Sequence, residues 1–111
     1  MMAMTDTYAA AAPSRDEIDA LAGPAVVEFG ANWCGFCIRA QPLVAEAFSV
    51  YPQVRHIKIE DGPGRRLGRS FKVKLWPTLI FLRDGQEIAR VVRPEDAAEI
   101  RQAFIQIVPE S

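Results

Sequence analysis

The sequence predicts an α/β fold in which a central mixed β-sheet of four strands is flanked by helices on both faces. Short apolar runs alternate along the chain with apolar residues at helical spacing, which is typical of strands connected by helices. A helical stretch separates the first two strand patterns, so that pair is expected to be parallel. An Asp-Gly turn joins the last two, so that pair is expected to be antiparallel. A fifth strand is expected only if Thr7 and Tyr8 add an edge.

The chain is long enough to fold without cross-links, because it has 111 residues of which 50% are hydrophobic. We expect residues 1–13 to be a mobile lead-in and residues 14–111 to form a single domain. Ser14 and Glu17 have the spacing of a capping box, which predicts a short helix at the start of this domain.

The first strand is predicted at residues 25–29, an apolar run interrupted only by Glu28 and typical of a central strand covered on both faces. Apolar residues then recur at helical spacing as far as Tyr51, which predicts a long helix with Pro42 inside it. A proline there removes a backbone hydrogen bond, so we expect a kink. Residues 54–60 alternate in polarity and predict the second strand.

In the second half of the chain a short helix is predicted after a Gly-Pro-Gly loop. Arg65, Arg66 and Arg69 are expected to form its solvated face rather than a partner site. The Asp-Gly turn joins strands predicted at residues 78–82 and 87–92. A last helix is expected to start at Pro94 and to dock one face on the sheet.

Composition argues against several classes of partner. A formal net charge of -1 gives no global field to gather nucleic acid or an anionic membrane surface. No window approaches the roughly 18 apolar residues of a membrane span. The first fourteen residues contain no Lys or Arg, unlike a signal peptide, so a cytoplasmic location is expected.

The chemistry is expected at Cys34 and Cys37, the only cysteines of the chain. Two thiols separated by two residues can close a small ring on the first turn of a helix, and that geometry favours redox cycling. The helix N-terminus stabilises a thiolate, which predicts Cys34 as the nucleophile and Cys37 as the resolving thiol. Exchange would then pass through a mixed disulfide between Cys34 and a substrate.

Two other interpretations of the cysteine pair are half of a metal site and an inert structural pair. A zinc or iron–sulfur site normally needs four ligands, and His56 is the only histidine in the chain. No metal and no bound cofactor are therefore expected. We interpret His56 as a strand residue rather than a general base, because dithiol exchange does not need an imidazole.

The order of elements and several motifs resemble the thioredoxin family over about residues 25–108. The specific pieces are the strand at residues 26–29, the Trp-Cys-Gly-Phe-Cys sequence at residues 33–37, the helical Pro42, the Trp-Pro-Thr sequence at residues 76–78 and the Asp-Gly turn. The resemblance implies an oxidoreductase of protein disulfides, with a redox-active Cys34–Cys37 disulfide in place of a cofactor. It also implies a reductase or other dithiol as electron donor, and we expect a monomer.

Further site residues follow from the same resemblance. It implies that Pro77 is a cis-proline lining a substrate groove and that Glu28 is a buried carboxylate beneath Cys37. Burial should raise the pKa of Glu28 and let it exchange a proton with Cys37. Alternatively, Glu28 is a purely structural acid paired with Lys58 on the neighbouring strand. On the first interpretation Glu28 and Lys58 join the cysteines as catalytic residues.

The sequence departs from the family pattern beside the cysteines. Phe36 stands where the family usually has proline, Trp76 is larger than the usual residue before the cis-proline, and Arg93 lies where a glycine is common. Phe36 keeps an N–H near Cys34, which favours the thiolate and predicts a more oxidising dithiol. Two tryptophans beside the motifs are expected to shape an apolar groove rather than only to fill the core. The expected substrate-binding residues are Trp33, Gly35, Phe36, Trp76, Pro77 and Arg93.

Two functions remain open on the sequence. The first is a thiol–disulfide oxidoreductase. The second is a peptide-binding module or assembly chaperone with the same fold and little redox turnover. Both Cys34 and Cys37 are present, which favours the first, since an adaptor needs neither thiol.

Overall fold

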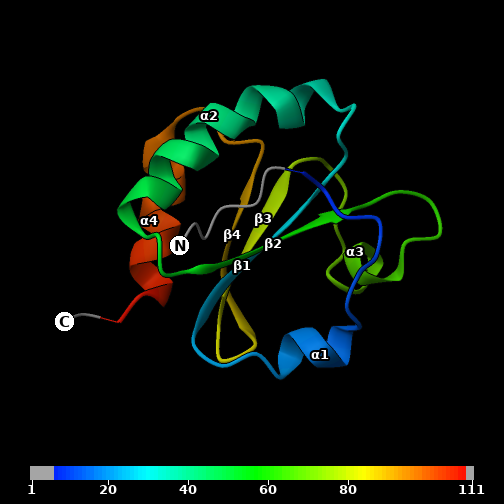
Figure 1. Cartoon of the computed structure of the whole chain (residues 1–111), viewed down its shortest axis with the longest axis horizontal. Helices are drawn as coiled ribbons and strands as arrows, with labels where there is room; N and C mark the ends of the chain where they lie inside the picture. Colours follow the sequence, from blue (N-terminus) through cyan, green and yellow to red (C-terminus); the bar gives the residue numbers. More distant parts are fainter. Residues whose placement is uncertain (1–6, 110–111) are drawn as a thin grey trace.

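Four strands form a mixed sheet at the centre of the computed structural model, which describes residues 7–109 (Figure 1). The spatial order is β2-β1-β3-β4. β1 pairs in parallel with β2 and antiparallel with β3, and β3 pairs antiparallel with β4. The predicted strand directions are therefore confirmed. The strands are β1 (Pro24–Gly30), β2 (Arg55–Glu60), β3 (Thr78–Arg83) and β4 (Gln86–Val92).

Two helices cover each face of the sheet, as predicted (Figure 1). One face packs against α2 and α4, and its apolar core includes Val26, Phe81 and Phe104. The other face packs against α1 and α3 through a second core that includes Val27 and Phe29. The helices are α1 (Arg15–Asp19), α2 (Gly35–Val50), α3 (Arg66–Ser70) and α4 (Ala97–Ile107).

The alternation of β1 places Glu28 beneath α2. Val27 and Phe29 point to the α1 and α3 side, so Glu28 points to the opposite face together with Val26. The parallel register sets Lys58 of β2 opposite Glu28. Both side chains are buried, so each requires polar partners.

The N-terminal segment belongs to the fold from Tyr8 onward. Residues 1–6 of the predicted mobile lead-in lie outside the described residues, but Tyr8 is only 5% exposed. Ala9 forms a single parallel bridge with Ile59 of β2, with backbone hydrogen bonds of 2.9 Å to Lys58 and Glu60. Tyr8 and Ala9, which belong to the expected lead-in, therefore pack on the domain, and the possible fifth strand reduces to one bridge.

Local signals fix the ends of several elements. The capping box of α1 is present, with the Ser14 hydroxyl accepting the Glu17 N–H. Pro42 lies inside α2, as expected. The last helix starts at Ala97 rather than at Pro94, because the Asp96 carboxylate caps it by accepting the Glu99 N–H.

Candidate active site

Cys34 stands at the N-cap of α2, where its sulfur meets an unpaired backbone donor. Its backbone is extended, and its Sγ accepts the N–H of Cys37 at 3.3 Å. The first N–H groups of a helix have no partner within the helix, and they stabilise negative charge placed among them. Both cysteines are free thiols in this structure. A thiolate at Cys34 would therefore be favoured by its position.

Cys37 lies one helical turn deeper and is held in its neutral form. It is 1% exposed, compared with 7% for Cys34. Burial and the hydrogen bond with Cys34 raise the pKa of Cys37 to about 12, although hydrogen bonds with the Ala31 backbone and with Tyr8 act in the opposite direction. Cys37 is thus less accessible than Cys34 and is kept in its thiol form, which suits it to the later step of an exchange.

The donor to Cys34 differs from the one expected from the sequence. The N–H that reaches the Cys34 sulfur belongs to Cys37, not to Phe36. This is the usual geometry of a helix cap, in which the side chain of the N-cap residue accepts from the second or third helical residue.

Two tryptophans line the surface beside the dithiol. Trp33 is 75% exposed and meets Trp76 edge-on, with ring centroids 5.7 Å apart. Trp76 also packs against the cluster that holds both cysteines. The Trp76–Pro77 peptide bond is cis. The exposure of Trp33 shows that it does not serve as core.

Arg93 joins the remaining predicted substrate-binding residues. Its guanidinium carbon lies 3.7 Å from the centroid of the Phe36 ring, which is 46% exposed. Its Nε donates to the Trp76 carbonyl at 2.9 Å, and its backbone N–H donates to the Pro77 carbonyl at 3.0 Å. The structure therefore brings Phe36, Trp76, Pro77 and Arg93 together, and Gly35 lies exposed at the adjoining start of α2.

Glu28 is the centre of a buried polar network under α2. Its Oε1 lies 2.9 Å from His56 Nε2, and its Oε2 accepts the Tyr8 hydroxyl and the Gln41 amide, the latter at 3.2 Å. Lys58 Nζ donates to Gln41 Oε1 at 2.6 Å and lies 4.3 Å from the Tyr8 ring centroid. The predicted neighbours Glu28 and Lys58 are thus linked through Gln41.

The pKa of Glu28 is lowered, contrary to the prediction from the sequence. Burial alone would raise it, but the hydrogen bond and charge of His56, the charge of Lys58 and the Tyr8 hydrogen bond together outweigh burial. The sequence argument counted desolvation and could not count these partners. Glu28 is therefore ionised at neutral pH.

Lys58 was predicted as a neighbour of Glu28, but His56, Gln41 and Tyr8 were not predicted as members of this network. His56 and Lys58 are two residues apart on β2 and therefore lie on the same face of the strand, which was a usable signal for a shared polar site. Gln41 follows Cys37 by one helical turn and donates to its carbonyl at 3.1 Å, so helical spacing could have indicated it. Tyr8 carried no signal, because it precedes an alanine run without periodicity.

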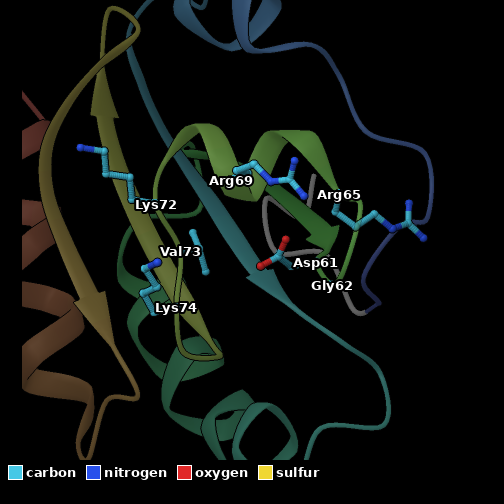
Figure 2. A pocket seen from close by; sticks show the side chains of 7 residues that line it. All are labelled: Asp61, Gly62, Arg65, Arg69, Lys72, Val73 and Lys74. Atoms are coloured by element: carbon cyan, nitrogen blue, oxygen red, sulfur yellow. The ribbon is translucent and has the colours of Figure 1, made fainter.

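A pocket with mostly basic side chains lies next to α3 (Figure 2). Figure 2 shows Arg65 and Arg69 on its α3 side, Lys72 and Lys74 on the opposite side and Asp61 between them. Asp61 Oδ2 accepts the Trp76 indole N–H at 2.9 Å, which ties the pocket to the site. Arg65 is more than a solvated residue, since it pairs with Glu60 at 2.5 Å and donates to the Ala10 carbonyl at 2.6 Å.

Within residues 7–109, no three potential metal ligands of the His, Cys, Asp or Glu type lie together. Over the same range, none of the helices has the length and apolar character needed to cross a membrane.

A dithiol at a helix N-terminus, beside a cis-proline on a four-stranded mixed sheet, defines a thiol–disulfide oxidoreductase in general terms. The family model described as thioredoxin matches residues 8–106, and the chain belongs to the thioredoxin family.

Three known members of the family are similar over about three quarters or more of their length. The structure of thioredoxin 2 from Pseudomonas aeruginosa PAO1 in its reduced form matches with a TM-score of 0.84 and 64% identity, over 94% of this chain and 96% of that one. Thioredoxin Asp f 28 of Aspergillus fumigatus is 31% identical over 80 residues, covering 72% of this chain and 74% of its own. Thioredoxin-1 of Saccharomyces cerevisiae is 35% identical over 79 residues, covering 71% and 76%.

Proposed function

We propose that this protein exchanges its Cys34/Cys37 dithiol with the disulfides of other proteins, with Cys34 as nucleophile and Cys37 as resolving thiol. The observation that carries the proposal is the position of Cys34 at the N-cap of α2, with the Cys37 N–H 3.3 Å from its sulfur. That donor and the helix dipole favour the thiolate, which is the attacking species.

The exchange takes two displacements. The Cys34 thiolate attacks one sulfur of a substrate disulfide, a mixed disulfide forms and the other substrate sulfur leaves as a thiolate. Cys37 then loses its proton and attacks the Cys34 sulfur, which releases the second substrate thiolate and forms the Cys34–Cys37 disulfide. Two electrons pass from the dithiol to the substrate, and a reductase or another dithiol returns them. No metal or cofactor takes part.

The surface around Cys34 would hold the substrate chain. Exposed aromatic surface at Trp33 and Phe36 supplies apolar contact, and Trp76, which precedes the cis-proline Pro77, packs against the dithiol cluster. Gly35 leaves the helix start uncovered, and Arg93 fixes the Phe36 ring against this loop. We further propose that the protein acts as a monomer in the cytoplasm.

Reduction of insulin by dithiothreitol tests this function. Wild type should accelerate the reaction, and Cys34→Ser should abolish the acceleration. Cys37→Ser should form a mixed disulfide with insulin but fail to resolve it, which intact-mass spectrometry detects. If Cys34→Ser were as fast as wild type, exchange at this dithiol would be excluded.

A peptide-binding role is the second candidate, and the 75% exposure of Trp33 beside Trp76 favours it. In that case a Cys34→Ser/Cys37→Ser variant should bind unfolded polypeptide as tightly as wild type while neither protein reduces insulin. Binding that depends on the thiols, together with turnover by wild type, would rule this role out.

A further inference from the structure

The tyrosine of the N-terminal segment reaches the resolving cysteine through a gap left by Gly30. A Cβ atom built on Gly30 would lie 2.7 Å from Cys37 Sγ, 2.7 Å from Tyr8 Cζ and 2.8 Å from the Tyr8 hydroxyl oxygen. A Cβ atom cannot lie so close to these atoms, so the Tyr8 hydroxyl and the Cys37 sulfur both border the space that a side chain at residue 30 would fill. Tyr8, Cys37 and Cys34 form one buried cluster with Ala31.

The Tyr8 hydroxyl also contacts the buried carboxylate. It donates its single proton to Glu28 Oε2, while His56 Nε2 lies against the other carboxylate oxygen at 2.9 Å. A hydroxyl that gives its proton away keeps lone pairs that can accept another. Tyr8 is therefore placed to accept from the Cys37 thiol and to donate to Glu28 in the same arrangement.

We infer that Tyr8 is a catalytic proton-transfer residue, whose hydroxyl carries the proton of the Cys37 thiol to the Glu28 carboxylate when the mixed disulfide is resolved. The inference rests on the proposed exchange reaction and adds to it a residue outside the Cys-Gly-Phe-Cys turn.

The step balances in protons and electrons. The Cys37 S–H proton passes to the Tyr8 oxygen as the Tyr8 O–H proton passes to Glu28. The sulfur of Cys37 attacks the Cys34 sulfur, the bond between Cys34 and the substrate breaks, and the substrate leaves as a thiolate with the electron pair. Glu28 is left protonated and later returns its proton to solvent. Tyr8 ends with one proton, as it began.

The acidities of the three groups require a concerted transfer. Burial and the neighbouring Glu28 raise the pKa of Tyr8, so it does not give up its proton without gaining another. The lowered pKa of Glu28 makes it a weak base, and it holds the proton only while the new S–S bond forms. The titratable groups around Cys37 and Tyr8 are Cys34 of the motif turn, Glu28 of β1, and His56 and Lys58 of β2.

The Tyr8→Phe variant tests the inference, because it removes the hydroxyl and keeps the buried ring. The assay is stopped-flow reaction of the full-length protein with 5,5′-dithiobis(2-nitrobenzoate), which separates formation of the Cys34 mixed disulfide from its resolution by Cys37. We expect formation within about twofold of wild type and resolution slower by about tenfold or more at pH 7, in line with general-base catalysis. Resolution should then rise tenfold per pH unit, as hydroxide replaces the relay, while wild type varies less.

Two further variants separate a proton transfer from a packing role. Tyr51→Phe is the matched control, since Tyr51 packs on Phe104 at the far end of α2, and both of its steps should equal those of wild type. Glu28→Gln removes the acceptor of the same proton transfer, so it should slow resolution too, and adding it to Tyr8→Phe should cost little further rate.

The outcomes are distinct. Slow resolution with a changed pH profile and normal formation supports the inference. Unchanged resolution in Tyr8→Phe, or equal slowing of both steps with an unchanged pH profile, overturns it and leaves the proposed exchange intact. If wild type releases no second thiolate at all, the proposed function fails and this inference fails with it.

Discussion

Replacing His56 with alanine should destabilise the fold, because the buried Glu28 carboxylate would lose the partner of its Oε1 atom. Glu28 is fully buried and has three hydrogen-bonding partners, His56, Tyr8 and Gln41. Breaking a buried ionic pair by deleting one partner costs about 3–5 kcal/mol. Since two of the three partners remain, we expect His56→Ala to lose about 3 kcal/mol of unfolding free energy at pH 7, near the lower end of that range.

The pH dependence of stability distinguishes the loss of the Glu28–His56 interaction from a simple loss of packing. Glu28 has a lowered pKa in the folded state, so its contribution to stability is complete above its unfolded pKa of about 4.5 and is lost as pH falls through the folded pKa. In His56→Ala that contribution shrinks. The difference in stability between wild type and variant should therefore be largest at neutral pH and should narrow below about pH 4.5.

Urea unfolding at a series of pH values measures both effects, with the slope of free energy against urea held as a check on two-state behaviour. His56→Gln is the control, because it keeps a donor of similar reach. A Glu28→Gln/His56→Ala double variant should recover part of the loss, since no buried charge is left unpaired. A loss below about 1 kcal/mol, or a difference that does not change with pH, would refute the pairing argument.

Three more predictions concern the dithiol and its surface. Glu28→Gln should slow resolution of a mixed disulfide more than its formation, and stopped-flow kinetics with both steps unchanged would assign Glu28 a structural role only. Brief alkylation with iodoacetamide at pH 8 should modify Cys34 and spare Cys37, whose pKa of about 12 keeps it a buried thiol; equal labelling in peptide mass spectrometry would contradict this. Arg93→Ala should raise KM for insulin severalfold with little change in kcat, because it frees Phe36 and the Trp76 carbonyl, and Arg93→Lys should be intermediate; a fall in kcat alone would argue against a binding role.

The sheet and the dithiol were predictable because their signals are local. The Asp84-Gly85 turn adopts positive φ at both residues, as a two-residue hairpin requires, so its sequence reports its geometry directly. The spacing of Cys34 and Cys37 places both sulfurs on one helical turn in any helix that begins there. Neither inference needs knowledge of a distant residue.

The Glu28 network depends on long-range contacts that a single sequence does not encode visibly. Tyr8 and His56 are separated from Glu28 by 20 and 28 residues. Which groups surround Glu28 follows from the β1–β2 register and from the path of the N-terminal segment, and both are set by the packed core. The direction predicted for the Glu28 pKa shift was wrong for the same reason. The shift is the sum of the effects of several partners, and the sequence does not give their positions.

The bridge at Ala9 has a consequence for self-association. An edge strand exposes unpaired N–H and C=O groups, which can template pairing with a second chain. On β2, the Ala9 N–H donates to the Lys58 carbonyl and the Ala9 carbonyl accepts the Glu60 N–H, so these two edge groups are not available to a second chain. The opposite edge, β4, carries an Arg90–Glu87 ion pair and a register shift against β3. The segment that brings Tyr8 to the dithiol thus also shields one side of the sheet from edge-to-edge aggregation.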